Sequence, residues 1–108
     1  MSAQKQVLVV DLNDKKEYQR LIDGQEQSLG LKAGRVYLEP GNECGVHSTE
    51  AREELLVFLS GTGTMIIGDN TPIEVGVGKI AYIPPHTQHN IKNSGSEPLI
   101  YVFCVVPV

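Results

Sequence analysis

Two histidines and one glutamate are the side chains of this sequence best suited to bind a metal ion. His47 and Glu54 belong to one cluster of polar residues, and His89 belongs to a second. If residues 48–53 close a hairpin, His47 stands opposite Glu54 with Cβ atoms about 5 Å apart. The neighbouring Glu53 then points to the opposite face, so strand register selects Glu54. An imidazole and a carboxylate at this separation can share one ion or hydrogen-bond each other.

The second cluster is expected to bring another imidazole to the same place. Its polar residues Gln88, Asn90 and Lys92 alternate along a strand and belong in water. His89 and Ile91 therefore point inward. A turn centred on Pro85 and His86 would set Tyr82 opposite His89.

Two inward imidazoles and one carboxylate would suit a divalent transition metal if the two clusters meet. Two imidazoles and one carboxylate are the ligands of non-haem iron(II) sites, and three protein ligands plus water suit a catalytic zinc. The expected ion is Fe, Mn, Ni or Zn, and ligand type alone does not choose among them. The alternative is a metal-free pocket in which Glu54 pairs with His47, because a buried carboxylate without a partner is costly.

Short strands separated by turns must position these residues. The strands expected from alternation and from Gly, Pro, Asn and Asp punctuation are Val7–Val10, Leu31–Glu39, Cys44–Thr49, Glu54–Leu59, Thr64–Ile67, Ile73–Val75, Ile80–Ile83, His89–Lys92 and Leu99–Val106. One helical turn is expected over 14–22, capped by Asn13 or Asp14. This pattern predicts an all-β protein, an antiparallel sandwich or small barrel. The length of 108 residues supports one domain.

The spacing of the polar residues resembles the two motifs of the cupin superfamily. The first motif, G-x5-H-x-H-x3,4-E-x6-G, falls on Gly41, His47, Thr49, Glu54 and Gly61. The second, G-x5-P-x-G-x2-H-x3-N, falls on Gly78, Pro84, His86, His89 and Asn93. The resemblance implies an RmlC-like double-stranded β-helix, or jelly-roll barrel, as a single cupin domain over residues 1–108. It also implies one metal in the barrel mouth, held by His47, Glu54 and His89.

Two motif positions depart from the family pattern. Thr49 replaces the second histidine, and its neutral hydroxyl is expected to hold a metal-bound water at most. His86 replaces a glycine, which implies a positive φ and a side chain at the rim of the site. Cys44 has the opposite strand parity to His47 and is expected to be structural, and Cys104 is expected to fill the core.

Two classes of function remain open. In the first, the protein is a metal-dependent enzyme of the dioxygenase, isomerase or lyase kind that acts on a small oxygen-bearing molecule. In the second, it is a non-catalytic module that binds or senses a small molecule in a degenerate or metal-free site, a reading favoured by the loss of the second histidine. The expected cavity lining is partly apolar: Val36, Leu38, Leu56, Phe58, Ile80 and Ile91.

Composition excludes several classes of partner. Nine Lys+Arg against thirteen Asp+Glu give a net charge of -4, and the basic residues form no stripe, which argues against nucleic-acid binding. No apolar run approaches the ~20 residues that span a bilayer, and the apolar residues before Asn13 are too few for a signal-peptide core. Two cysteines do not form a disulfide scaffold. We expect a cytoplasmic protein with reduced thiols and no membrane partner.

The strand at 54–59 is apolar on both faces. Leu56 and Phe58 lie on one face, and Leu55, Val57 and Leu59 on the other. One face of an antiparallel sheet usually meets water, so the second apolar face needs a cover. The pattern favours a homodimer. The alternative is that the N-terminal segment or the C-terminal strand of the same chain covers this face.

Overall fold

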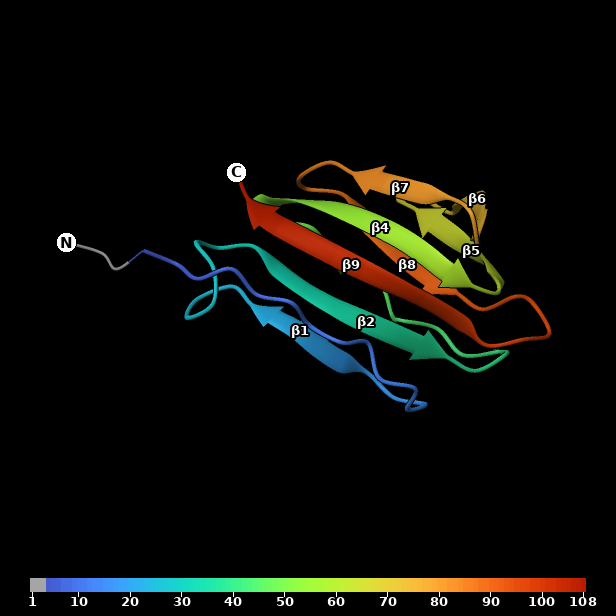
Figure 1. Cartoon of the computed structure of the whole chain (residues 1–108). Coiled ribbons are helices and arrows are strands. Elements are labelled where there is room, and N and C mark those ends of the chain that lie inside the picture. Colours follow the sequence, from blue (N-terminus) through green and yellow to red (C-terminus); the bar gives the residue numbers. More distant parts are fainter. Residues whose placement is uncertain (1–3) are drawn as a thin grey trace.

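The computed structural model describes residues 4–108, which form nine strands and no helix (Figure 1). The strands are β1 (Gln19–Asp23), β2 (Lys32–Leu38), β3 (His47–Ser48), β4 (Arg52–Ser60), β5 (Thr62–Ile67), β6 (Thr71–Gly76), β7 (Ile80–Ile83), β8 (Gln88–Lys92) and β9 (Leu99–Pro107). They make a five-stranded sheet of order β1-β2-β9-β4-β7 and a four-stranded sheet of order β3-β8-β5-β6. Every strand pairing is antiparallel. The expected all-β jelly roll is confirmed.

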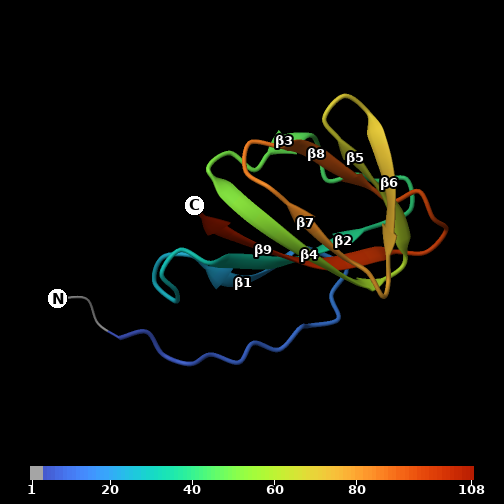
Figure 2. The ribbon, with the colours of Figure 1, turned by 90° about the horizontal axis from the view of Figure 1, so that it is seen from above.

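The two sheets face each other and enclose the core between them (Figure 2). Alternation along β4 and β9 turns every second side chain inward, and β5 and β8 supply the facing side chains. The buried cluster is Leu38, Leu56, Phe58, Met65, Val75, Ile83, Ile91, Leu99 and Tyr101. The densest packing therefore lies between β4 and β9 on one side and β5 and β8 on the other.

Most of the expected strands are present, and three expectations are wrong. The helical turn over 14–22 is absent, because residues 19–23 instead pair with β2 and extend the sheet edge. Val7–Val10 forms no strand, since its backbone pairs with neither sheet. The strand expected over Cys44–Thr49 shortens to β3, preceded by one isolated bridge between Glu43 and Lys92.

Neither expected hairpin forms, because each intervening loop crosses from one sheet to the other. β3 pairs with β8, so His47 stands opposite His89 rather than Glu54. Glu54 pairs instead with Ile83 of β7 and Val105 of β9. The loops after β3 and after β7 therefore turn corners of the barrel, as jelly-roll connections do.

A buried arginine fixes the chain before β1 against the outer side of the five-stranded sheet. The Arg35 guanidinium donates hydrogen bonds to the carbonyl oxygens of Asn13, Lys15 and Glu17 and to Oδ1 of Asn13. Upstream of this anchor the chain runs extended on the side away from the four-stranded sheet (Figure 2). Val7 and Val9 there are 95% and 90% exposed.

The outer face of β4 and β7 is apolar and open to solvent. Leu55, Leu59 and Ile80 are exposed on it, so the expectation that Ile80 lines the cavity is wrong. Tyr82 pairs with Leu55 rather than His89, and its hydroxyl donates a hydrogen bond to Glu53. Among residues 4–108, no helix is long and apolar enough to cross a membrane.

Candidate metal centre and cavity

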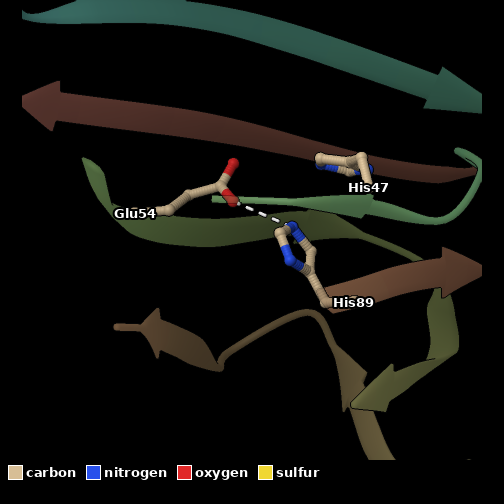
Figure 3. Close-up of side chains that lie close together, drawn as sticks. All are labelled: His47, Glu54 and His89. Atoms are coloured by element: carbon tan, nitrogen blue, oxygen red, sulfur yellow. Dashed lines mark ion pairs between the residues drawn. The ribbon is translucent and has the colours of Figure 1, made fainter. Parts of the chain in front are cut away.

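His47, Glu54 and His89 come together between the two sheets (Figure 3). They lie on β3, β4 and β8, and one ligand atom from each falls within 4.8 Å of the others. Glu54 and His89 are 7% and 2% exposed, whereas His47 is exposed at the rim. The rings of His47 and His89 meet edge to face, with centroids 4.2 Å apart. The predicted convergence is therefore present, although by cross-sheet packing rather than across a hairpin.

Backbone carbonyls fix the orientation of both imidazoles. Nδ1 of His47 lies 2.9 Å from the Gly45 carbonyl oxygen, and Nδ1 of His89 lies 3.0 Å from that of Thr87. A carbonyl can only accept, so Nδ1 carries the proton in each ring. In the neutral tautomer this leaves Nε2 of both rings as a bare donor atom, which is the arrangement found in metal-ligating histidines.

Glu54 and His89 form an ion pair, with 3.1 Å between Oε1 and Nε2. Burial alone would lower the pKa of His89. The hydrogen bond to Glu54, the bond to the Thr87 carbonyl and the charge of Glu54 outweigh burial and raise that pKa above its ordinary value. With Nδ1–H engaged, a neutral His89 would turn a lone pair toward the carboxylate. The pair therefore needs a cation between its atoms, either a proton or a metal ion.

These residues sit in a cavity of about 520 Å³ between the sheets. Its apolar walls are Val36, Leu38, Leu56, Ile91, Phe103 and Val105. Cys44, which the sequence analysis expected to be structural, also lines it. Burial raises the pKa of the Cys44 thiol. The short β3 strand does not extend back to Cys44, so strand parity from His47 does not apply there.

Comparison with known sequences identifies the family. The family profile described as Cupin domain matches residues 34–106, which is more than half of the chain. The chain belongs to the cupin family. Its relatives include an uncharacterised protein of Methanocaldococcus jannaschii, 36% identical over 84 residues, which cover 78% of this chain and 63% of that protein. The glucose-6-phosphate isomerase of Pyrococcus abyssi is 35% identical over 93 residues, which cover 75% of this chain and 49% of the isomerase.

Solved structures agree with the cupin fold. An RmlC-like cupin family protein from Methanocaldococcus jannaschii, described as a double-stranded β-helix, matches with a TM-score of 0.79 at 19% identity, over 97% of this chain and 94% of that one. A double-stranded β-helix protein from Klebsiella pneumoniae matches with a TM-score of 0.74 at 22% identity, over 96% and 91%. The matched part of the cupin covers 63% of the Methanocaldococcus relative and about half of the isomerase, less than two thirds of either.

Thr49, at the position of the second motif histidine, uses its hydroxyl to hydrogen-bond the backbone of this cupin. Its buried hydroxyl donates to the Pro84 carbonyl at 2.7 Å and accepts from the Thr87 amide at 3.1 Å. The side chain thus joins the segment after β3 to the loop between β7 and β8. The hydroxyl has one proton, and it is donated to the Pro84 carbonyl. Because Pro84 and Thr87 both lie between β7 and His89, these two bonds fix the loop that precedes His89.

His86, at the position of the motif glycine, lies outside the group of ligand atoms. Its φ is 55°, the positive value that the motif implied, and its side chain is exposed. Its backbone amide donates to the Glu50 carbonyl at 2.8 Å. His86 is therefore a residue of the rim, as expected.

Two asparagines of β8 and the turn after it are buried. The sequence analysis assigned Asn90 to solvent and gave Asn93 no role beyond its motif position. Asn90 is buried, against the expectation of a solvent-facing residue, because its amide bonds Glu43 and the Gly45 amide of the segment that covers β8. Asn93 ends the second motif, and its amide donates to the carbonyls of Leu38 and Glu97. Both side chains tie loops to the barrel that carries the site.

Proposed function

We propose that this cupin holds one divalent metal ion with His47, Glu54 and His89 and that it binds or transforms a small oxygen-bearing molecule in the adjoining cavity. The observation that carries the proposal is the convergence of one ligand atom from each of the three side chains within 4.8 Å, with Nδ1 of both imidazoles engaged by backbone carbonyls. Fe, Mn, Ni and Zn all accept this donor set. The proposed unit is a single cupin domain over residues 1–108.

When bound, such an ion supplies Lewis-acid polarisation of a substrate oxygen. The protein supplies the rest of the site. The Gly45 and Thr87 carbonyls hold the imidazoles in place, Thr49 secures the loop before His89, and the apolar walls exclude water. Among enzyme classes, the similarity to archaeal glucose-6-phosphate isomerases favours isomerisation of a small carbonyl compound over dioxygenase or lyase chemistry.

The second candidate is a non-catalytic binding or sensing module. It is favoured by Thr49, which offers no imidazole to the site and whose hydroxyl is occupied by backbone groups. Incubation of metal-loaded protein with fructose 6-phosphate separates the two, with glucose 6-phosphate followed by NMR. Turnover that is lost with His89→Gln supports an isomerase, and binding without turnover supports the module.

Metal content tests the proposed centre directly. Protein purified without chelator is expected to carry close to one divalent ion per chain by elemental analysis, and Glu54→Ala and His89→Ala are expected to lose most of it. His47→Ala is the variant least prone to misfolding, because His47 is exposed. His86→Gln is the matched control, since it removes an imidazole from the rim alone. Full occupancy in all three ligand variants would show that the proposed ligand set is wrong.

We also propose that the cupin is a homodimer that works in a reducing compartment, the cytoplasm. The exposed valines Val7 and Val9 and the apolar outer face with Leu55 and Ile80 support the dimer, because both lie outside the barrel core. The two unpaired cysteines support the compartment. Light scattering should give the mass of two chains for wild type and of one chain for Leu55→Lys combined with Ile80→Lys. A monomeric wild type would refute the dimer.

A further inference from the structure

Two basic side chains line the cavity without an acidic partner. Lys32 of β2 and Arg52 of β4 both border it, and neither forms an ion pair or a side-chain hydrogen bond with any residue in the part of the chain that the structure describes. The two carboxylates of the cavity are already engaged. Glu54 pairs with His89, and Glu43 accepts from the Asn90 amide and lies 3.9 Å from the Lys92 ammonium. Asp23 of β1 stands opposite Lys32, but its Oδ1 accepts from the backbone amides of Gln25 and Gln27. Neither cation is therefore paired with a carboxylate in the described part of the chain.

Strand register places both cations on the same inner face as Glu54. Lys32 and Glu54 are both partners of Val105, on the two sides of β9. With strands about 4.8 Å apart, their Cα atoms are roughly 10 Å apart. Arg52 precedes Glu54 by two residues on β4, which is about 7 Å along the same face. The cations and the proposed metal centre therefore border one space.

The surface between these charges is apolar. Val105 lies between Lys32 and Glu54, and Phe103 and Leu56 form the next row of the inner face. Tyr18 stacks on Phe103 with ring centroids 6.3 Å apart and also lines the cavity. A molecule that reaches from the metal centre to the cations must therefore cross a hydrophobic wall.

We propose that the cavity selects a small organic anion whose carboxylate or phosphate binds Arg52 and Lys32. The oxygen-bearing end of the same molecule reaches His47, Glu54 and His89, and its carbon body packs on the apolar wall. This proposal rests on the proposed function of the site. Arg52 offers the planar pair of donors that matches a carboxylate or phosphate, and Lys32 adds a point charge.

Calorimetric titration of the metal-loaded protein tests the proposal with matched anionic and neutral ligands. Fructose 6-phosphate is compared with fructose, and glutarate with 1,5-pentanediol, so the two arms distinguish phosphate from carboxylate. At least one anion is expected to bind about tenfold or more tightly than its neutral partner. Raising the salt concentration is expected to weaken that binding.

Three variants assign the effect to the two cations. Arg52→Gln is expected to weaken anion binding about tenfold or more, and Lys32→Gln about threefold. Lys79→Gln is the control, since it removes an equal charge from a lysine that does not line the cavity. Anions that bind no more tightly than their neutral partners, or unchanged anion binding in Arg52→Gln and Lys32→Gln, would overturn the proposal.

The two proposals fail separately. Metal content in Arg52→Gln is expected to equal that of wild type, because Arg52 is not a ligand. A protein that binds no metal but still prefers the anion in titrations of the metal-free form would refute the metal centre alone. A metal-loaded protein that shows no preference for the anion would refute the anion site alone.

Discussion

Nε2 of His89 lies 3.1 Å from Oε1 of Glu54, although the two residues belong to opposite sheets. Both side chains are buried, and each is held from its own strand. The contact therefore joins the two layers of the barrel at the mouth of the cavity. Its strength depends on what lies between the two atoms, and in metal-free protein that is a proton.

The stability of the metal-free protein should fall as pH rises above the ordinary histidine pKa. The pKa of His89 is raised in the folded state, so the ion pair contributes fully below the unfolded value of 6.5 and is lost as pH rises through the folded value. Urea unfolding in chelator between pH 6 and pH 9 should show this decline. It should be absent in His89→Gln and present in His86→Gln. A wild-type curve parallel to that of His89→Gln would contradict the assignment.

Thr49→Val should destabilise the protein by about 1–3 kcal/mol, because the Pro84 carbonyl and the Thr87 amide both lose a partner. Thr64→Val is the control. The Thr64 hydroxyl bonds the Ser94 hydroxyl at an exposed position, so its loss should cost less than about 0.5 kcal/mol. Unfolding free energies of the two variants check the difference. Equal losses would mean that Thr49 does not secure the loop.

Arg35→Met should release the chain before β1. The guanidinium holds three backbone carbonyls of residues 13–17, so its removal frees the backbone around the already exposed Lys15 and Lys16 to enter a protease active site. Limited trypsin digestion should cut there about tenfold faster than in wild type, while the barrel remains resistant. Arg20→Met, from the neighbouring edge strand, is the control. Cleavage at the wild-type rate in Arg35→Met would refute the anchoring role.

Gly61→Ala should destabilise the barrel more than Gly41→Ala. Both glycines have positive φ, 82° and 88°, so both substitutions carry the same backbone strain of about 1 kcal/mol. A Cβ at Gly61 would also collide with the Pro98 carbonyl, whereas one at Gly41 would meet nothing within 4 Å. Thermal melts of the two variants separate strain from collision. Equal melting temperatures would show that the turn at Gly61 yields freely.

Local alternation predicted which side chains face inward but not the strands that pair. Odd and even positions settle which residues share a face, so Glu54 rather than Glu53 and the inward His89 followed from the sequence. Pairing partners depend on whether a loop folds back or crosses to the other sheet. The loop after β3 reads as a hairpin in the sequence, yet it crosses, and His47 therefore meets His89 as its strand partner.

Burial by distant segments also escapes local patterns. Asn90 occupies a position that alternation assigns to solvent, and only the segment around Glu43 and Gly45, folded over β8, buries it. The residues of β1 have a helical pattern, but a free edge of β2 offers them sheet hydrogen bonds. Burial by a distant segment and pairing with a free sheet edge depend on the folded structure, so the spacing of residues in the sequence does not predict them.

The side-chain amide of Asn93 donates to the carbonyls of Leu38 and Glu97, and Asn93 itself does not line the cavity. Asn93 is nonetheless one of the positions of the second cupin motif, by which this fold is recognised in a sequence. A homologue that had lost its catalytic activity would still need this asparagine to keep the fold. A match to the motif thus indicates the fold. The function of such a protein must be judged from the donor atoms of His47, Glu54 and His89 and from the charges around them.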